Sequence, residues 1–113
     1  IYNLSEMEFI TKTIAENPVV IFGKSYCPFC KKAIRCISAT GCHFLNIDLE
    51  SEIGREEVIL RRQDGSEIQN ALYKMTGRST VPNVFIRGKS IGGGDDTEQL
   101  YQSGKLQEMV AGL

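Results

Sequence analysis

The segment Cys27-Pro28-Phe29-Cys30 contains the residues best suited to chemistry, two thiols in a C-x-x-C spacing. It follows the apolar run Val19-Val20-Ile21-Phe22, which predicts a buried strand, and it opens a stretch with helical periodicity. At a helix N-terminus, unpaired backbone N–H groups and the macrodipole favour a thiolate by up to about 2 kcal/mol. Lys24 adds a second positive charge nearby. We therefore predict that Cys27 is substantially ionised at neutral pH and acts as a nucleophile.

The two cysteines are expected to differ in exposure, and this difference assigns their roles. Cys27 stands at or before the first helical residue, whereas Cys30 falls on an apolar face with Ala33 and Ile34. Pro28 fits the first helical position, where its missing N–H removes no hydrogen bond. We therefore predict that Cys27 attacks a disulfide and that Cys30 resolves the mixed disulfide.

The alternative interpretation of this C-x-x-C is structural, either a zinc knuckle or two inert core thiols. A zinc site usually brings a second C-x-x-C or a pair of histidines. The other candidate ligands in the sequence are Cys36, Cys42 and His43, which have no such spacing. We therefore predict no metal site, with Cys36 and Cys42 as buried core thiols and His43 as a structural residue.

Two further segments have the composition of a ligand site. In Thr80-Val81-Pro82 the residues alone favour an ordinary trans bond before Pro82, because only about 5–6% of X–Pro bonds are cis. A cis bond would instead turn the N–H and C=O of Val81 outward, able to pair with a peptide-like ligand. In Gly92-Gly93-Gly94-Asp95-Asp96, glycines allow close backbone approach, and the carboxylates with helical N–H groups would grip a zwitterion. Alone, that second segment is most often only a loop and a helix cap.

The apolar pattern predicts the elements that position these segments. A capping box of the form S-x-x-E at Ser5 precedes the first helix, and Phe9, Phe44 and Tyr73 are assigned to the core. The first two strands are expected to be parallel. Helices are predicted from Ser5 to Glu16, Pro28 to Ile37, 50–63, Ile68 to Met75 and Asp95 to Tyr101. Strands are predicted at Val19–Phe22, Phe44–Leu49, Val84–Arg87 and Ser90–Ile91, the last two joined by a turn at Gly88-Lys89. This order predicts a mixed sheet with helices on both faces.

Composition limits the class of protein. The 113 residues, 42% hydrophobic and 24% charged, predict a single folded domain over residues 1–113 and exclude a mainly disordered chain. A net charge of −1 gives no general attraction to nucleic acid or anionic membranes. Four cysteines are too few for a disulfide scaffold, in which cysteine exceeds about 8–10% of residues, and fit a reducing compartment. The expected location is the cytoplasm, or an organelle if a targeting segment preceded Ile1.

The chain resembles a known family, the glutaredoxins of the dithiol class. The matching segments, in order, are Lys24-Ser25-Tyr26-Cys27-Pro28-Phe29-Cys30, Thr76-Gly77, Thr80-Val81-Pro82-Asn83-Val84-Phe85-Ile86 and Ile91-Gly92-Gly93, followed by Asp96. The resemblance implies a thioredoxin-like α/β fold, with a four-stranded mixed sheet flanked by helices on both faces and a cis Val81–Pro82 bond. It implies a monomeric enzyme that reduces protein disulfides and glutathione mixed disulfides. Glutathione would be the co-substrate, with no tightly bound cofactor.

By position, the resemblance also implies a glutathione site. Lys24 and Gln69 would meet one glutathione carboxylate, Val81 would pair through its backbone, and Asp96 would meet the amino group. The implied glutathione-binding residues are Lys24, Phe29, Gln69, Thr80, Val81, Pro82, Gly94, Asp95 and Asp96. The chain departs from the family pattern at Phe29, commonly Tyr, and at Ser79, where many members have an Arg that meets a glutathione carboxylate; neighbouring Arg78 is a candidate replacement. The stretch 50–63 is also longer than usual.

Two competing functions fit the same residues. A [2Fe–2S] carrier would use Cys27 of two protomers and two glutathiones as ligands. Pro28 argues against it, because a rigid first turn leaves less room to adjust around a cluster. A thioredoxin-like reductase driven by a flavoprotein is disfavoured because Lys24 and the Gly-Gly-Asp segment suit a small zwitterion.

Overall fold

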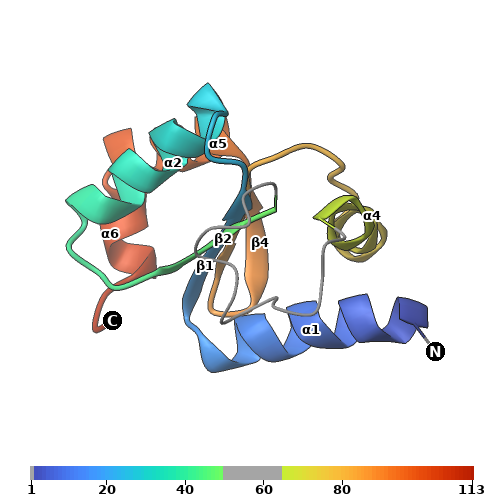
Figure 1. Ribbon diagram of the computed structural model, residues 1–113. Helices are drawn as coiled ribbons and strands as arrows, with labels where there is room; N and C mark the ends of the chain where they lie inside the picture. The colour runs from blue at the N-terminus through green and yellow to red at the C-terminus, as the bar shows by residue number, and fades with distance from the viewer. Residues whose placement is uncertain (1, 50–64) are drawn as a thin grey trace.

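The computed structural model describes residues 2–49 and 65–113 (Figure 1). The helix predicted over 50–63 lies outside the described residues. No helix within 2–49 and 65–113 has the length and apolar character needed to span a membrane. The helices are α1 (Tyr2–Glu16), α2 (Pro28–Ala39), α4 (Gly65–Thr76), α5 (Gly94–Gln102) and α6 (Lys105–Met109), and the strands are β1 (Val19–Gly23), β2 (Leu45–Asp48), β3 (Asn83–Ile86) and β4 (Lys89–Gly92).

The four strands form one mixed sheet in the order β2-β1-β3-β4. Strand β1 pairs in parallel with β2 and antiparallel with β3, and β3 pairs antiparallel with β4. The whole of β1 is buried, as expected of a continuous apolar strand covered on both faces. The predicted mixed sheet is therefore confirmed.

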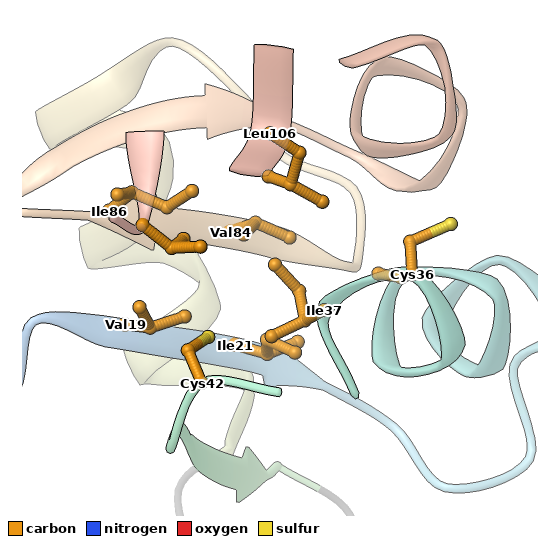
Figure 2. Packing of buried hydrophobic residues seen from close by; sticks show 10 residues of the cluster. Val19, Ile21, Cys36, Ile37, Cys42, Val84, Ile86 and Leu106 are labelled. Carbon is orange, nitrogen blue, oxygen red and sulfur yellow. The ribbon is translucent and has the colours of Figure 1, made fainter. Parts of the chain in front are cut away.

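Helices cover both faces of the sheet. Alternate residues of each strand point to opposite faces, so the sheet contributes side chains to two cores. Val20 and Phe22 of β1 join a core under α1 and α4, and the Phe22 ring meets Phe85 edge-on, with ring centroids 5.6 Å apart. Val19 and Ile21 join a second core under α2 and α6. Figure 2 shows this second core, in which Ile37 of α2 points toward Ile21 and Val84. In Figure 1, α1 and α4 lie on one side of the sheet and α2, α5 and α6 on the other.

Three local predictions are wrong. Helix α1 begins at Tyr2, so Ser5 lies inside the helix and not at its cap. The β3–β4 turn is centred on Arg87-Gly88, one residue earlier than predicted. Both residues have positive φ, as a tight hairpin requires. The Arg87 guanidinium donates hydrogen bonds to the carbonyls of Met109 and Ala111. Tyr73 is 54% exposed on α4, although Phe9 and Phe44 pack partly buried against the two cores.

Candidate active site

The C-x-x-C segment lies where β1 ends and α2 begins. Cys27 is the N-cap residue of α2, with extended backbone angles, and Pro28 is the first helical residue. The Cys27 N–H donates to the Lys24 carbonyl at 3.1 Å, and its carbonyl accepts from the Lys31 N–H at 3.1 Å. The placement predicted for Cys27 and Pro28 is therefore confirmed: the thiol stands at the positive end of the helix.

The two thiols differ in exposure, as predicted. Cys27 is half-buried, whereas Cys30 is only 2% exposed. The Cys30 Sγ atom accepts a hydrogen bond from the Lys24 N–H at 3.4 Å. Gly23 makes this packing possible, because a Cβ atom there would lie 2.8 Å from the Cys30 Sγ. Cys27 is thus the accessible thiol, and Cys30 lies beneath it against the end of β1.

The surroundings of Cys27 favour its thiolate. Burial raises its pKa, but hydrogen bonds from the N–H groups of Cys30 and Phe29 and from the Cys30 thiol together lower it by more. The charge of Lys24 adds a smaller lowering. The pKa of Cys27 therefore lies below that of an ordinary cysteine, and the first turn of α2 contributes more to this than the lysine does.

Cys30 has the opposite character. Burial, together with the hydrogen bond and negative charge of Cys27 and the charge of Asp48, raises the pKa of Cys30 to about 12. The hydrogen bond from the Lys24 N–H opposes this shift only in part. Cys27 is therefore the thiol of the pair that ionises first as pH rises, and Cys30 stays protonated at neutral pH.

The Val81–Pro82 peptide bond is cis. This confirms what the family resemblance implied, and it shows that the trans bond favoured by the residues alone is wrong, because a local preference of about 0.5–1 kcal/mol does not fix the isomer in a folded chain. Pro82 is buried and leads directly into β3. The Cys27 thiol lies 3.9 Å from the Val81 carbonyl oxygen. The structure thus brings Cys27 and the Val81 backbone together.

The glycine-rich segment at the start of α5 packs against the C-x-x-C loop. A Cβ atom on Gly94 would lie 2.6 Å from the Phe29 carbonyl oxygen, so only glycine allows this approach. Phe29 itself is 50% exposed, with its ring available to a ligand. Asp96 accepts a hydrogen bond from the Gly93 N–H at 2.9 Å, which caps α5. The predicted helix cap is therefore confirmed, and Gly94 joins α5 to the site.

Two basic residues hold the acidic side chains of the site: Lys32, which sequence reasoning missed, and Arg78, which it named only as a candidate contact for a glutathione carboxylate. Lys32 of α2 contacts Asp95 at 2.9 Å and Glu98 at 3.3 Å, and these hydrogen bonds raise the pKa of Lys32. Its Nζ atom also stands 5.5 Å from the centre of the Phe29 ring. Arg78 pairs with Asp96 at 3.0 Å and donates to the Thr80 hydroxyl at 3.1 Å. The spacing of Lys32 from Phe29, three residues along a helix, was the available signal for the ring contact.

Gln69 contacts the chain segment that leads to Thr80. Its side-chain amide donates to the Ser79 carbonyl at 2.7 Å, so it supports the loop that precedes Thr80. Lys24 is half-buried at the start of the Cys27 loop. Cys36 and Cys42 are both 8% exposed and belong to the core under α2, as predicted, whereas His43 is exposed before β2.

The sequence model of the glutaredoxin family matches residues 19–91, more than half of the chain and the part that contains the C-x-x-C loop and the Val81–Pro82 bond. The chain belongs to the glutaredoxin family. Among its relatives, Glutaredoxin-C6 of Oryza sativa subsp. japonica is 47% identical over 99 residues, which cover 88% of this chain and 80% of the relative. Glutaredoxin-C4 of Arabidopsis thaliana is 43% identical over 105 residues, covering 93% and 70%.

Solved structures agree with this assignment. A buckwheat glutaredoxin, solved as a complex with glutathione, matches this glutaredoxin with a TM-score of 0.81 and 34% identity, covering 96% of this chain and 89% of the other. A wheat glutaredoxin matches with a TM-score of 0.80 and 41% identity, covering 97% and 94%. The thioredoxin-like fold that the resemblance implied is thereby confirmed.

Proposed function

We propose that this glutaredoxin reduces protein disulfides and glutathione mixed disulfides, with glutathione as the electron donor. The observation that carries the proposal is the pairing of an accessible Cys27, whose pKa is lowered, with a buried Cys30, whose pKa is raised to about 12. A thiolate attacks a disulfide sulfur, whereas a thiol does not. We therefore assign the two cysteines to successive steps: Cys27 attacks the substrate disulfide, and Cys30 reacts only afterwards.

On a glutathione mixed disulfide, the Cys27 thiolate attacks the glutathione sulfur. The Cys27–glutathione disulfide forms while the substrate sulfur leaves as a thiolate and takes a proton from water. A second glutathione thiolate then attacks the glutathione sulfur of this intermediate. Glutathione disulfide leaves, and the Cys27 thiolate is restored. In the net reaction one free glutathione converts the mixed disulfide into the substrate thiol and glutathione disulfide, and Cys30 takes no part.

On a protein disulfide, Cys27 first forms a mixed disulfide with the substrate. Cys30 then loses its proton and attacks the Cys27 sulfur, which releases the second substrate thiolate and leaves a Cys27–Cys30 disulfide. Two glutathiones reduce this disulfide in turn. Because Cys30 is buried under Cys27, its sulfur lies beside the bond that it must break.

The residues around Cys27 suit a charged tripeptide. The backbone of Val81 would pair with the peptide part of glutathione as an added strand does, and Asp96 would accept its ammonium. The Phe29 ring and Thr80 would line the same groove, with Pro82 and Gly94 shaping its floor, while Lys24 and Gln69 would serve one carboxylate. The glutathione complex of the similar buckwheat protein supports this proposal.

The test is a coupled assay on a small glutathione mixed disulfide, with each cysteine replaced in turn. Cys27→Ser should abolish turnover, whereas Cys30→Ser should retain it; on a protein disulfide, both variants should be inactive. Cys36→Ser and Cys42→Ser serve as matched controls, since both thiols lie in the core. Loss of activity in both Cys27→Ser and Cys30→Ser on the small substrate would refute the separate roles.

The competing function is the glutathione-ligated [2Fe–2S] carrier, which would use the same Cys27 thiolate. Pro28 at the first helical position argues against it. Visible absorbance and size-exclusion chromatography after anaerobic purification separate the two functions. The proposed reductase is a colourless monomer, and a brown dimer would favour the carrier.

A further inference from the structure

The Arg78 guanidinium connects two residues of the proposed glutathione groove. One of its terminal nitrogens donates to the Asp96 carboxylate at 3.0 Å, and the other donates to the Thr80 hydroxyl at 3.1 Å. The same Asp96 oxygen also accepts from the Gly93 N–H at 2.9 Å. In the unliganded protein, Arg78 therefore occupies the carboxylate that a ligand ammonium would need.

The backbone around Arg78 is shaped to admit this side chain. A Cβ atom on Gly93 would lie 2.7 Å from an Arg78 guanidinium nitrogen, so the absence of a side chain lets the guanidinium lie against the start of α5. A cavity of about 710 Å³ adjoins the ion pair, lined by Arg78, Asp96, Gly77, Gly92 and neighbouring residues. The side chains of Arg78 and Asp96 are 32% and 49% exposed. The ion pair is thus reachable from solvent, and Arg78 has room to move away from Asp96.

We propose that Arg78 and Asp96 together select the amino-acid zwitterion of the glutathione γ-glutamyl group by exchanging partners. The ligand ammonium takes Asp96, and the freed Arg78 guanidinium takes the carboxylate on the same ligand carbon. This inference rests on the proposed function, because it concerns how that site chooses its ligand. Arg78 is a specificity residue in this account and takes no part in the thiol chemistry.

The exchange discriminates between ligands because every charged group of the site keeps a partner of opposite charge only when the ligand is a zwitterion. One ion pair within the protein is replaced by two between protein and ligand. A ligand with the ammonium alone would leave Arg78 without a counter-ion beside another cation. A ligand with the carboxylate alone would leave Asp96 bound to Arg78 and gain only a shared contact. A partly exposed ion pair contributes up to about 1 kcal/mol, a factor of about five in affinity.

Calorimetry with S-methylglutathione measures binding without thiol chemistry. Two analogues separate the charges: one has glutaryl in place of γ-glutamyl and lacks the ammonium, and the other has 4-aminobutanoyl and lacks the carboxylate. The wild-type protein should bind S-methylglutathione about fivefold more tightly than either analogue. Arg78→Gln should bind S-methylglutathione and the carboxylate-free analogue with affinities within about twofold, while still discriminating against the ammonium-free analogue. Asp96→Asn should show the reverse pattern.

Two further variants serve as controls. Arg78→Lys keeps the charge and should retain part of the discrimination. Lys12→Gln removes the same charge and breaks the exposed Lys12–Glu16 pair on α1, and it should behave as wild type. If Arg78→Gln keeps full discrimination, or binds S-methylglutathione more tightly than wild type, the exchange is refuted. Turnover of a mixed disulfide is measured separately, so an inactive protein with the expected binding pattern would refute the proposed function and not this inference.

Discussion

The Sγ atom of Cys27 lies 3.9 Å from the carbonyl oxygen of Val81, across 54 residues of sequence. The sheet creates this contact. Phe22 of β1 pairs with Asn83 of the antiparallel β3, so the C-terminal end of β1 and the N-terminal end of β3 lie side by side at the same end of the sheet. The chain leaving β1 reaches Cys27, and the chain entering β3 arrives through Val81 and Pro82. The nucleophile and the backbone that would hold a peptide ligand are therefore placed by the same strand pair.

Cys27 should react with iodoacetamide at a pH where free cysteine is mostly protonated. Its pKa is lowered, so its thiolate should persist as pH falls below about 8.5 and be lost only as pH passes down through the lowered pKa. The measurement is the alkylation rate against pH, followed by mass spectrometry. Cys27→Ser should remove the fast labelling, because Cys30, Cys36 and Cys42 are buried. A midpoint at or above that of free cysteine would contradict the proposed thiolate.

The sequence predicted this nucleophile because the relevant physics is local. A buried strand, a proline and an amphipathic helix adjoin one another in sequence, so the position of Cys27 at the N-terminus of α2 and the burial of Cys30 both follow from periodicity. The mixed sheet followed in the same way from the order of the elements.

The contacts of Arg78 and Lys32 could not be predicted in this way, because each depends on which side chains the fold brings beside α5. Asp95 and Asp96 were predicted as ligand contacts, but periodicity does not show which cation occupies a carboxylate in the free protein. The exposure of Tyr73 was missed for a different reason. Tyr73 directly follows Leu72, and helical periodicity alone places adjacent residues on different faces, so the sequence did carry this signal.

Lys32→Gln should loosen the contact between α2 and α5. The side chain joins Asp95 and Glu98 and also lies over the Phe29 ring, but these acidic partners are partly exposed. We therefore expect a small fall in the free energy of unfolding, which should shrink at high salt because solvent ions screen partly exposed pairs. Urea denaturation at low and high salt measures this. Lys31→Gln, a neighbouring exposed lysine, should have no comparable effect, and equal losses in both variants would attribute the change to net charge alone.

Gly94→Ala should disturb the active-site loop. The added Cβ atom would lie 2.6 Å from the Phe29 carbonyl oxygen, so either α5 or the Cys27–Cys30 loop must shift, at an expected cost of about 1–3 kcal/mol. Because the Phe29 and Cys30 N–H groups help to lower the Cys27 pKa, the shift should also slow Cys27 alkylation at neutral pH. Gly41→Ala is the matched control: its φ of +82° makes alanine strained, but no atom lies within 4 Å. It should cost stability without slowing alkylation, and equal slowing in both would show a general folding defect.

Asn83→Ala should destabilise the start of β3 more than its small change in volume suggests. Asn83 is 1% exposed; its amide nitrogen donates to the Thr76 hydroxyl at 3.1 Å, and its oxygen accepts from the Ser90 hydroxyl at 2.7 Å. Removing the amide leaves both hydroxyls short of a partner, at an expected cost of about 1–3 kcal/mol in urea unfolding. Ser90→Ala removes one of these bonds from a less buried strand and should cost less. The Thr76 hydroxyl also accepts the Arg78 N–H at 3.1 Å, so Asn83→Ala should weaken S-methylglutathione binding as well. Stability equal to wild type would mean that water replaces the amide, and that this network does not hold the loop before Thr80.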